Sequence, residues 1–184
     1  MVKIIKVFLV TFVAYLFQVC VMPYLPISSI TPNILIAVIA IVTVAYGRFF
    51  AFGSGAVCGI LMEIMVASID YMYLLIYPVM GFMGSLVYAD KSERRLEQER
   101  SIGKKGKNMP AVLRTILCAG MDIAIYEVVN LTYVYLTGVD LGMIHLGRAL
   151  ISVLYTMGVT CVIMLPLRRF LGVWKRASNQ GANR

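Results

Sequence analysis

Long apolar segments, separated by short polar breaks, make up most of the chain. Apolar residues run almost without interruption through six segments, at 5–24, 32–46, 49–67, 71–89, 110–137 and 148–167. An α-helix needs about 20 residues to cross a hydrocarbon core of ~30 Å, and fewer where it is buried among other helices. The pattern therefore predicts an all-α membrane protein whose six transmembrane helices form one bundle.

The break between the second and third segments is very short, because only Gly47 and Arg48 separate them. One interpretation merges the two segments into a single long or re-entrant element. A single helix from 32 to 67 would be longer than any bilayer is thick. We therefore predict two helices joined by a tight turn, with Pro32 in the first turn of the second helix.

Composition agrees with this pattern. Apolar residues make up 60% of the chain and charged residues 14%, and the mean hydropathy is +0.85. Soluble domains contain roughly 45–50% apolar and about 25% charged residues, so the chain lacks the polar surface that a soluble domain of its size requires. The cysteines are expected to be small buried apolar residues, because each lies in a different apolar stretch without metal-ligand spacing; they are Cys20, Cys58, Cys118 and Cys161.

The net charge of +8 could indicate nucleic-acid binding, but the basic residues lie at the ends of apolar segments. If both termini are cytoplasmic, 16 of the 17 Lys and Arg residues lie on the cytoplasmic side and only Arg148 lies outside. This is the distribution that orients membrane proteins. We therefore expect a multi-pass protein of the cell membrane with a retained first helix and no nucleic-acid partner.

The hydrophilic segment 90–109 allows two interpretations. Its first half alternates in charge at helical spacing and could extend the fourth helix, and its second half is a basic loop. The segment could dock a cytoplasmic partner, or it could be a linker whose basic residues lie against anionic headgroups. It divides the chain into parts of four and two helices within the single domain 1–184.

Small residues recur every four positions along the third segment and end at an acid. Ala51, Gly55, Gly59 and Glu63 therefore share one helical face. Small residues let helix backbones approach closely in lipid. One interpretation is packing within the chain, and the other is a partner contact or cavity that includes Glu63.

Two further acids lie in the fifth segment, where charged groups are costly. Asp122, Tyr126, Asn130 and Tyr133 share one face, while Glu127 diverges from Asp122 by about 140°. The two acids are therefore poorly placed to act as a catalytic pair, and we expect an interhelical hydrogen-bond network. The fourth segment should be kinked at Pro78, with small residues at Gly81, Gly84 and Ser85.

Enzymatic chemistry has little support in the sequence. The single histidine, His145, is expected in an outer loop without a neighbouring acid and nucleophile. The protease, metal and phosphate-binding motifs are absent. We therefore expect a protein that is not an enzyme and binds no cofactor or metal.

The stretch 32–86 resembles the MreD family, the small integral membrane component of the bacterial cell-elongation machinery. The similarity lies in a proline-led short helix (TPNILIAVIAIVTVAYG), a glycine-stepped helix that ends in an acid (GSGAVCGILMEIM) and an aromatic helix with PVMGFMG. The chain departs from the family pattern in having Glu63 where aspartate is usual, and in its longer, more charged segment 90–109. The family likeness also implies a fold similar to that of the substrate-binding S subunits of energy-coupling factor vitamin transporters.

The resemblance implies a non-catalytic scaffold or regulator of rod shape and lateral peptidoglycan synthesis. Its expected partners are MreC and, through MreC, the RodA glycosyltransferase, a class B penicillin-binding protein and the actin-like MreB, besides membrane lipid. A vitamin-binding S subunit is the alternative. Such subunits dock through alanine-stepped faces on the first helix, where this chain has only Ala14. The faces expected to serve as contact or cavity surfaces contain Gly55, Gly59, Glu63, Asp122, Tyr126, Glu127 and Asn130.

Overall fold

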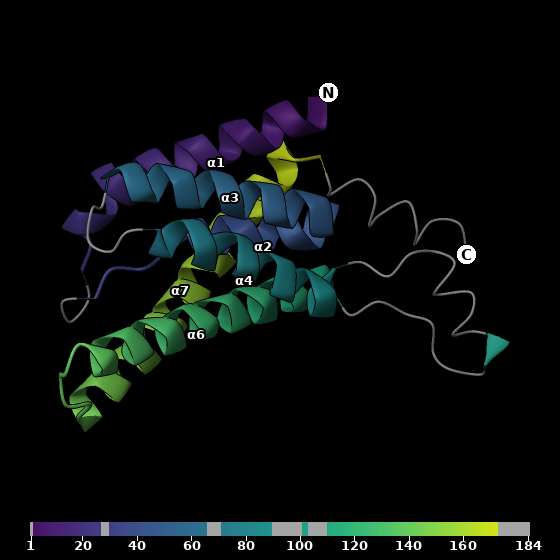
Figure 1. Ribbon diagram of the computed structural model, residues 1–184. Helices are drawn as coiled ribbons and strands as arrows, with labels where there is room; N and C mark the ends of the chain where they lie inside the picture. Colours follow the sequence, from purple (N-terminus) through teal and green to yellow (C-terminus); the bar gives the residue numbers. More distant parts are fainter. Residues whose placement is uncertain (1, 27–29, 66–70, 90–100, 103–109, 173–184) are drawn as a thin grey trace.

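The structure, a computed structural model, describes residues 2–26, 30–65, 71–89, 101–102 and 110–172. These residues form a bundle of antiparallel α-helices whose chain direction alternates from one helix to the next (Figure 1). The elements are α1 (Val2–Cys20), η1 (Met22–Tyr24), α2 (Ile34–Tyr46), α3 (Arg48–Met65), α4 (Met72–Tyr88), α6 (Ala111–Leu136) and α7 (Met143–Phe170). The expected helical extension and basic loop within 90–109 fall almost entirely outside the described residues.

The centre of the bundle is α2, a short and wholly apolar helix apart from Thr43. Eleven of its 13 residues are buried, and it contacts α1, α3, α4, α6 and α7. A helix of this length spans only about 20 Å at 1.5 Å per residue. Its isoleucines, valines and leucine form much of the core, and the helix begins inside the bundle rather than at its surface.

The tight turn between the second and third segments is confirmed. Gly47 ends α2 with a φ of 83°, and its N–H donates to the carbonyl of Thr43 at 3.0 Å. That backbone conformation favours glycine because it lacks a Cβ. Arg48 then begins α3 directly, so the chain reverses within one residue.

The sixth helix is longer than the sequence pattern predicted. It was expected over 148–167, but α7 begins at Met143 and ends at Phe170. The placement of His145 in a loop was therefore wrong, because this residue lies in the first turn of α7. The apolar residues that follow Gly142 continue the helix, and arginine is itself a good helix former, so Arg148 marks no boundary.

The outer faces of the bundle are apolar, unlike those of a soluble bundle. Large apolar residues are exposed along the outer faces of all the long helices, and small polar residues such as Thr11, Ser54 and Thr160 are buried between helices. This arrangement suits a lipid-facing surface. The segments Val2–Tyr24, Arg48–Met65 and Met143–Phe170 are long and apolar enough to cross a membrane, and α2 and α4 are shorter apolar helices. Crossing by all six helices remains a prediction.

The end of the bundle that holds the N-terminus is also the end where α3 and α6 begin and α7 ends (Figure 1). Basic residues lie in these end turns. The Nζ of Lys6 lies 5.9 Å from the centroid of the Phe170 ring, which brings the start of α1 to the end of α7. The Tyr46 hydroxyl donates to the carbonyl of Leu171 at 2.7 Å, which brings the end of α2 to the same place. The described basic residues at this end are Lys3, Lys6, Arg48, Arg114, Arg168 and Arg169, and Arg148 lies toward the other end.

Candidate functional site

The glycine face of α3 lies against the backbone of α4. A Cβ on Gly55 would stand 2.5 Å from the carbonyl oxygen of Tyr77, and one on Gly59 would stand 2.7 Å from that of Tyr73. From the other side, a Cβ on Gly81 would stand 2.7 Å from the carbonyl oxygen of Ala51. The two backbones therefore touch along this seam. Of the two interpretations of the stripe, the structure supports packing within the chain at Gly55 and Gly59, where no room is left for another helix.

Glu63, at the end of the stripe, closes the α3–α4 hairpin. Its Oε1 accepts a hydrogen bond of 2.6 Å from the backbone N–H of Tyr71. Tyr71 precedes α4 and has a φ of 64°, an uncommon conformation for a residue with a side chain. Glu63 is half-buried, and its Oε2 has no hydrogen-bond partner among the described residues. The acid thus satisfies one of the free N–H groups at the start of α4.

Asp122 fills the space left by a glycine on the neighbouring helix. It is fully buried in α6, and its Oδ1 stands 2.7 Å from the position that a Cβ on Gly84 would occupy. Its Oδ2 accepts a hydrogen bond from the Cys118 thiol at 3.6 Å, while Oδ1 has no partner in the described part of the chain. The carboxyl group is therefore enclosed between α6 and α4.

The two acids of α6 face different helices, as their spacing predicts. One turn beyond Asp122, the Tyr126 ring lies 6.3 Å from the ring of Tyr77 on α4. Glu127 lies instead on the side of α6 that faces Ser152 of α7. Asn130 is half-buried and lies beyond Ile123, the last fully buried residue of α6. Asp122 makes its hydrogen bond within α6, to Cys118, and Tyr126 meets α4 through a ring contact, so the expected interhelical hydrogen-bond network stays a prediction.

A polar cluster at the N-terminus of α2 was missed by the sequence analysis. Asn33 caps this helix, because its Oδ1 accepts from the N–H of Ile36 at 3.3 Å. The same side chain donates from Nδ2 to the Tyr77 hydroxyl at 2.9 Å, and so ties α2 to α4. An asparagine just after a proline and before an apolar run is the local signal that could have identified the cap.

Two further side chains accept from the first N–H groups of α2. Gln18 of α1 accepts from the N–H of Ile34 at 2.7 Å, and Thr156 of α7 accepts from the N–H of Asn33 at 3.3 Å. Four helices therefore meet at this point. The isolated glutamine in an otherwise apolar segment was a signal, but its partner is not visible in the sequence.

These groups hold helices together and show no arrangement typical of metal binding. Among the described residues, no group of three His, Cys, Asp or Glu side chains could hold a metal ion. All four cysteines are free. Their expected burial is correct for Cys58 and Cys118 but wrong for Cys20 and Cys161, which are exposed on outward helix faces because a lipid-facing surface also accepts small apolar residues.

Comparisons with protein-family models, with curated proteins and with solved structures find no match to this chain. The likeness to the MreD family therefore stays a prediction.

We expect Gly59→Ala to destabilise the bundle. The added methyl group would meet the backbone of Tyr73 and Leu74 at 2.7–2.9 Å, and such overpacking costs roughly 1–3 kcal/mol. Gly53→Ala on the same helix is the matched control, because nothing lies within 4 Å of its Cβ position and alanine favours a helix by about 1 kcal/mol. Unfolding in detergent, followed by circular dichroism, measures both. Equal stabilities of the two variants would contradict the close α3–α4 contact.

We expect the effects of Gly84→Ala and Asp122→Ala to be coupled. Gly84→Ala alone should destabilise the protein, because its methyl group would collide with the Asp122 carboxyl group. In the Asp122→Ala background the same change should cost much less, with a coupling free energy of about 1–2 kcal/mol. A double-mutant cycle in detergent measures this quantity. Strictly additive effects would show that the two side chains do not share this space.

We expect Asn33→Ala to destabilise the protein more than Asn33→Ser does. Alanine removes both the cap, worth about 1 kcal/mol, and the bond to Tyr77, whereas serine keeps a capping oxygen. Tyr77→Phe removes only the second bond, so it should cost about as much as Asn33→Ser, roughly 0.6 kcal/mol. Melting temperatures of the three variants measure the order. An Asn33→Ala protein as stable as the serine variant would contradict the capping role.

Proposed function

We propose that this protein is a non-catalytic scaffold of the bacterial cell-elongation machinery, similar to MreD, and that it binds an MreC-type bitopic partner. The observation that carries the proposal is the use of the intramembrane polar groups. Glu63, Asp122 and Asn33 each contact α4 or the residue that precedes it. The chain's polar chemistry is thus used to build a fixed bundle, as a scaffold requires.

The outer surface supports the same proposal. Its helices present broad apolar faces, which suit lipid and the apolar face of a partner helix. The gathering of basic residues at one end of the bundle supports an orientation with both termini in the cytoplasm of a bacterial inner membrane. In this proposal RodA, the class B penicillin-binding protein and MreB associate through MreC rather than with this chain directly.

Affinity purification of the tagged full chain from its native membrane in mild detergent tests the proposal. We expect mass spectrometry to recover an MreC-type protein together with the elongation glycosyltransferase and transpeptidase. Gly53→Ala, which should fold normally, is expected to recover the same proteins, and Gly59→Leu should lose them together with its fold.

Recovery of a transporter ATPase pair instead would contradict the scaffold and favour a vitamin-binding S subunit. A second measurement separates the two functions without any partner. A vitamin-binding subunit at a ligand concentration of 100 Kd should gain about 2.7 kcal/mol of stability. A scaffold should gain none from a panel of vitamins in a thermal unfolding assay.

A further inference from the structure

An apolar groove of about 400 Å³ runs between α1 and α7. We call it the α1–α7 groove. Its floor is α2, through Ile34 and Val38, and its walls include Leu9 and Val13 of α1 and Phe170 of α7. Every residue that lines it is apolar. The groove exists because α1 and α7 both pack on the short central helix, which does not fill the space between them.

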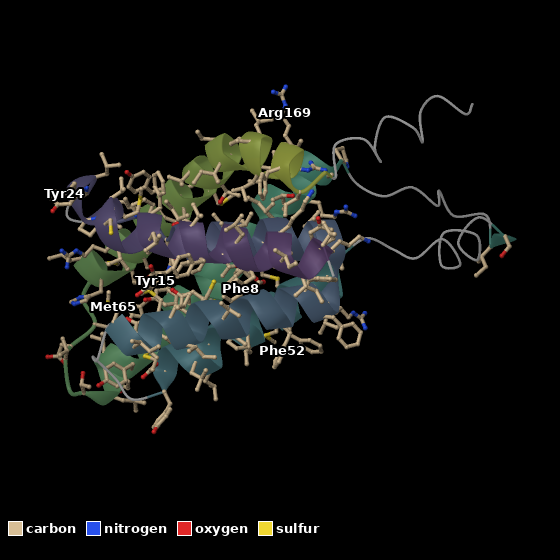
Figure 2. All side chains as sticks on the ribbon, turned by 90° about the horizontal axis from the view of Figure 1, so that it is seen from above. Phe8, Tyr15, Tyr24, Phe52, Met65 and Arg169 are labelled. Atoms are coloured by element: carbon tan, nitrogen blue, oxygen red, sulfur yellow. The ribbon has the colours of Figure 1, made fainter. Side chains whose placement is uncertain are left out.

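The groove ends beneath a cationic side chain at the basic end of the bundle. Phe170, one of its lining residues, lies with its ring 5.9 Å from the Nζ of Lys6. This is the distance of a cation–π contact, which holds an ammonium group over a ring face. Arg169, the residue before Phe170, does not line the groove and points away from the helices (Figure 2). The apolar groove therefore leads to the positive charge of Lys6.

We propose that the α1–α7 groove binds an anionic phospholipid, with an acyl chain along α2 and the phosphate at Lys6. The groove and its charged end match the two parts of such a molecule, because basic pockets between membrane helices bind anionic headgroups. A protein helix fits less well. Helix association in lipid relies on small residues and on hydrogen bonds between helices. The lining contains one small residue, Ala14, and no hydrogen-bonding side chain.

The lipid preference of the purified full chain tests this site. The protein in non-ionic detergent is mixed with phosphatidylglycerol and phosphatidylcholine of identical acyl chains, and native mass spectrometry counts the bound molecules of each. Each cation near a headgroup contributes roughly fivefold in affinity for anionic lipid. We therefore expect phosphatidylglycerol to be favoured, and Lys6→Gln to reduce that preference roughly fivefold.

Two further variants make the test specific. Arg148→Gln removes a cation near the opposite end of the bundle, so it should leave the preference unchanged. Val13→Trp places a ring in the groove from an exposed position on α1, so it should lower the binding of both lipids while circular dichroism stays that of the parent. Binding is measured without any protein partner, so its outcome is independent of the scaffold proposal.

Three results would overturn the site. Equal binding of the two lipids by the parent protein would show that the cations do not select a headgroup. A loss of preference in Arg148→Gln as large as that in Lys6→Gln would show attraction by net charge alone. Unchanged lipid binding by folded Val13→Trp would show that the acyl chain lies elsewhere.

Discussion

The bundle depends on the satisfaction of backbone N–H groups at the start of α2. This helix begins at the half-buried Asn33, and its first residues are buried in the bundle. The first N–H groups of a helix have no partner within the helix, and an unpaired polar group in an apolar medium costs several kcal/mol. Gln18, Asn33 and Thr156 supply the acceptors, and Asn33 in turn holds Tyr77. The geometry of one helix end thereby fixes how α1, α4 and α7 are placed along α2. A single cluster of hydrogen bonds thus fixes the relative positions of helices that are distant in the sequence.

Close backbone contact supplies the second source of cohesion. Lipid is as apolar as the helices, so burial of apolar surface gives little drive for them to associate. At the contact between α3 and α4, close packing stabilises the pair instead. The backbones approach at Gly55, Gly59 and Gly81 to distances that any Cβ would prevent. On another side of α4, the missing side chain of Gly84 leaves space for the carboxyl group of Asp122. Glycines on α4 therefore allow close approach on two of its sides.

Local patterns predicted much of this architecture, because helix length, the glycine at the tight turn and four-residue spacing are properties of neighbouring residues. They placed Gly55 and Gly59 on one face and separated Asp122 from Glu127. They did not reveal which helix each face meets, because that depends on long-range packing. The bond between residues 18 and 34 and the contact between Gly84 and Asp122 join positions whose partners no local spacing encodes.

The position of α1 at the edge of the bundle leaves grooves on both of its sides. Its main contacts among the described elements are with α2, α3 and η1, so it is an edge helix with neighbours on one side. One groove lies between it and α7, and a second lies between it and α3 and is lined in part by Gly53. A bundle whose polar groups are used internally can offer partners and lipids only its apolar outer faces and its charged ends. Both kinds of surface come together along α1, so the scaffold proposal and the lipid proposal both point to this helix as the place of contact.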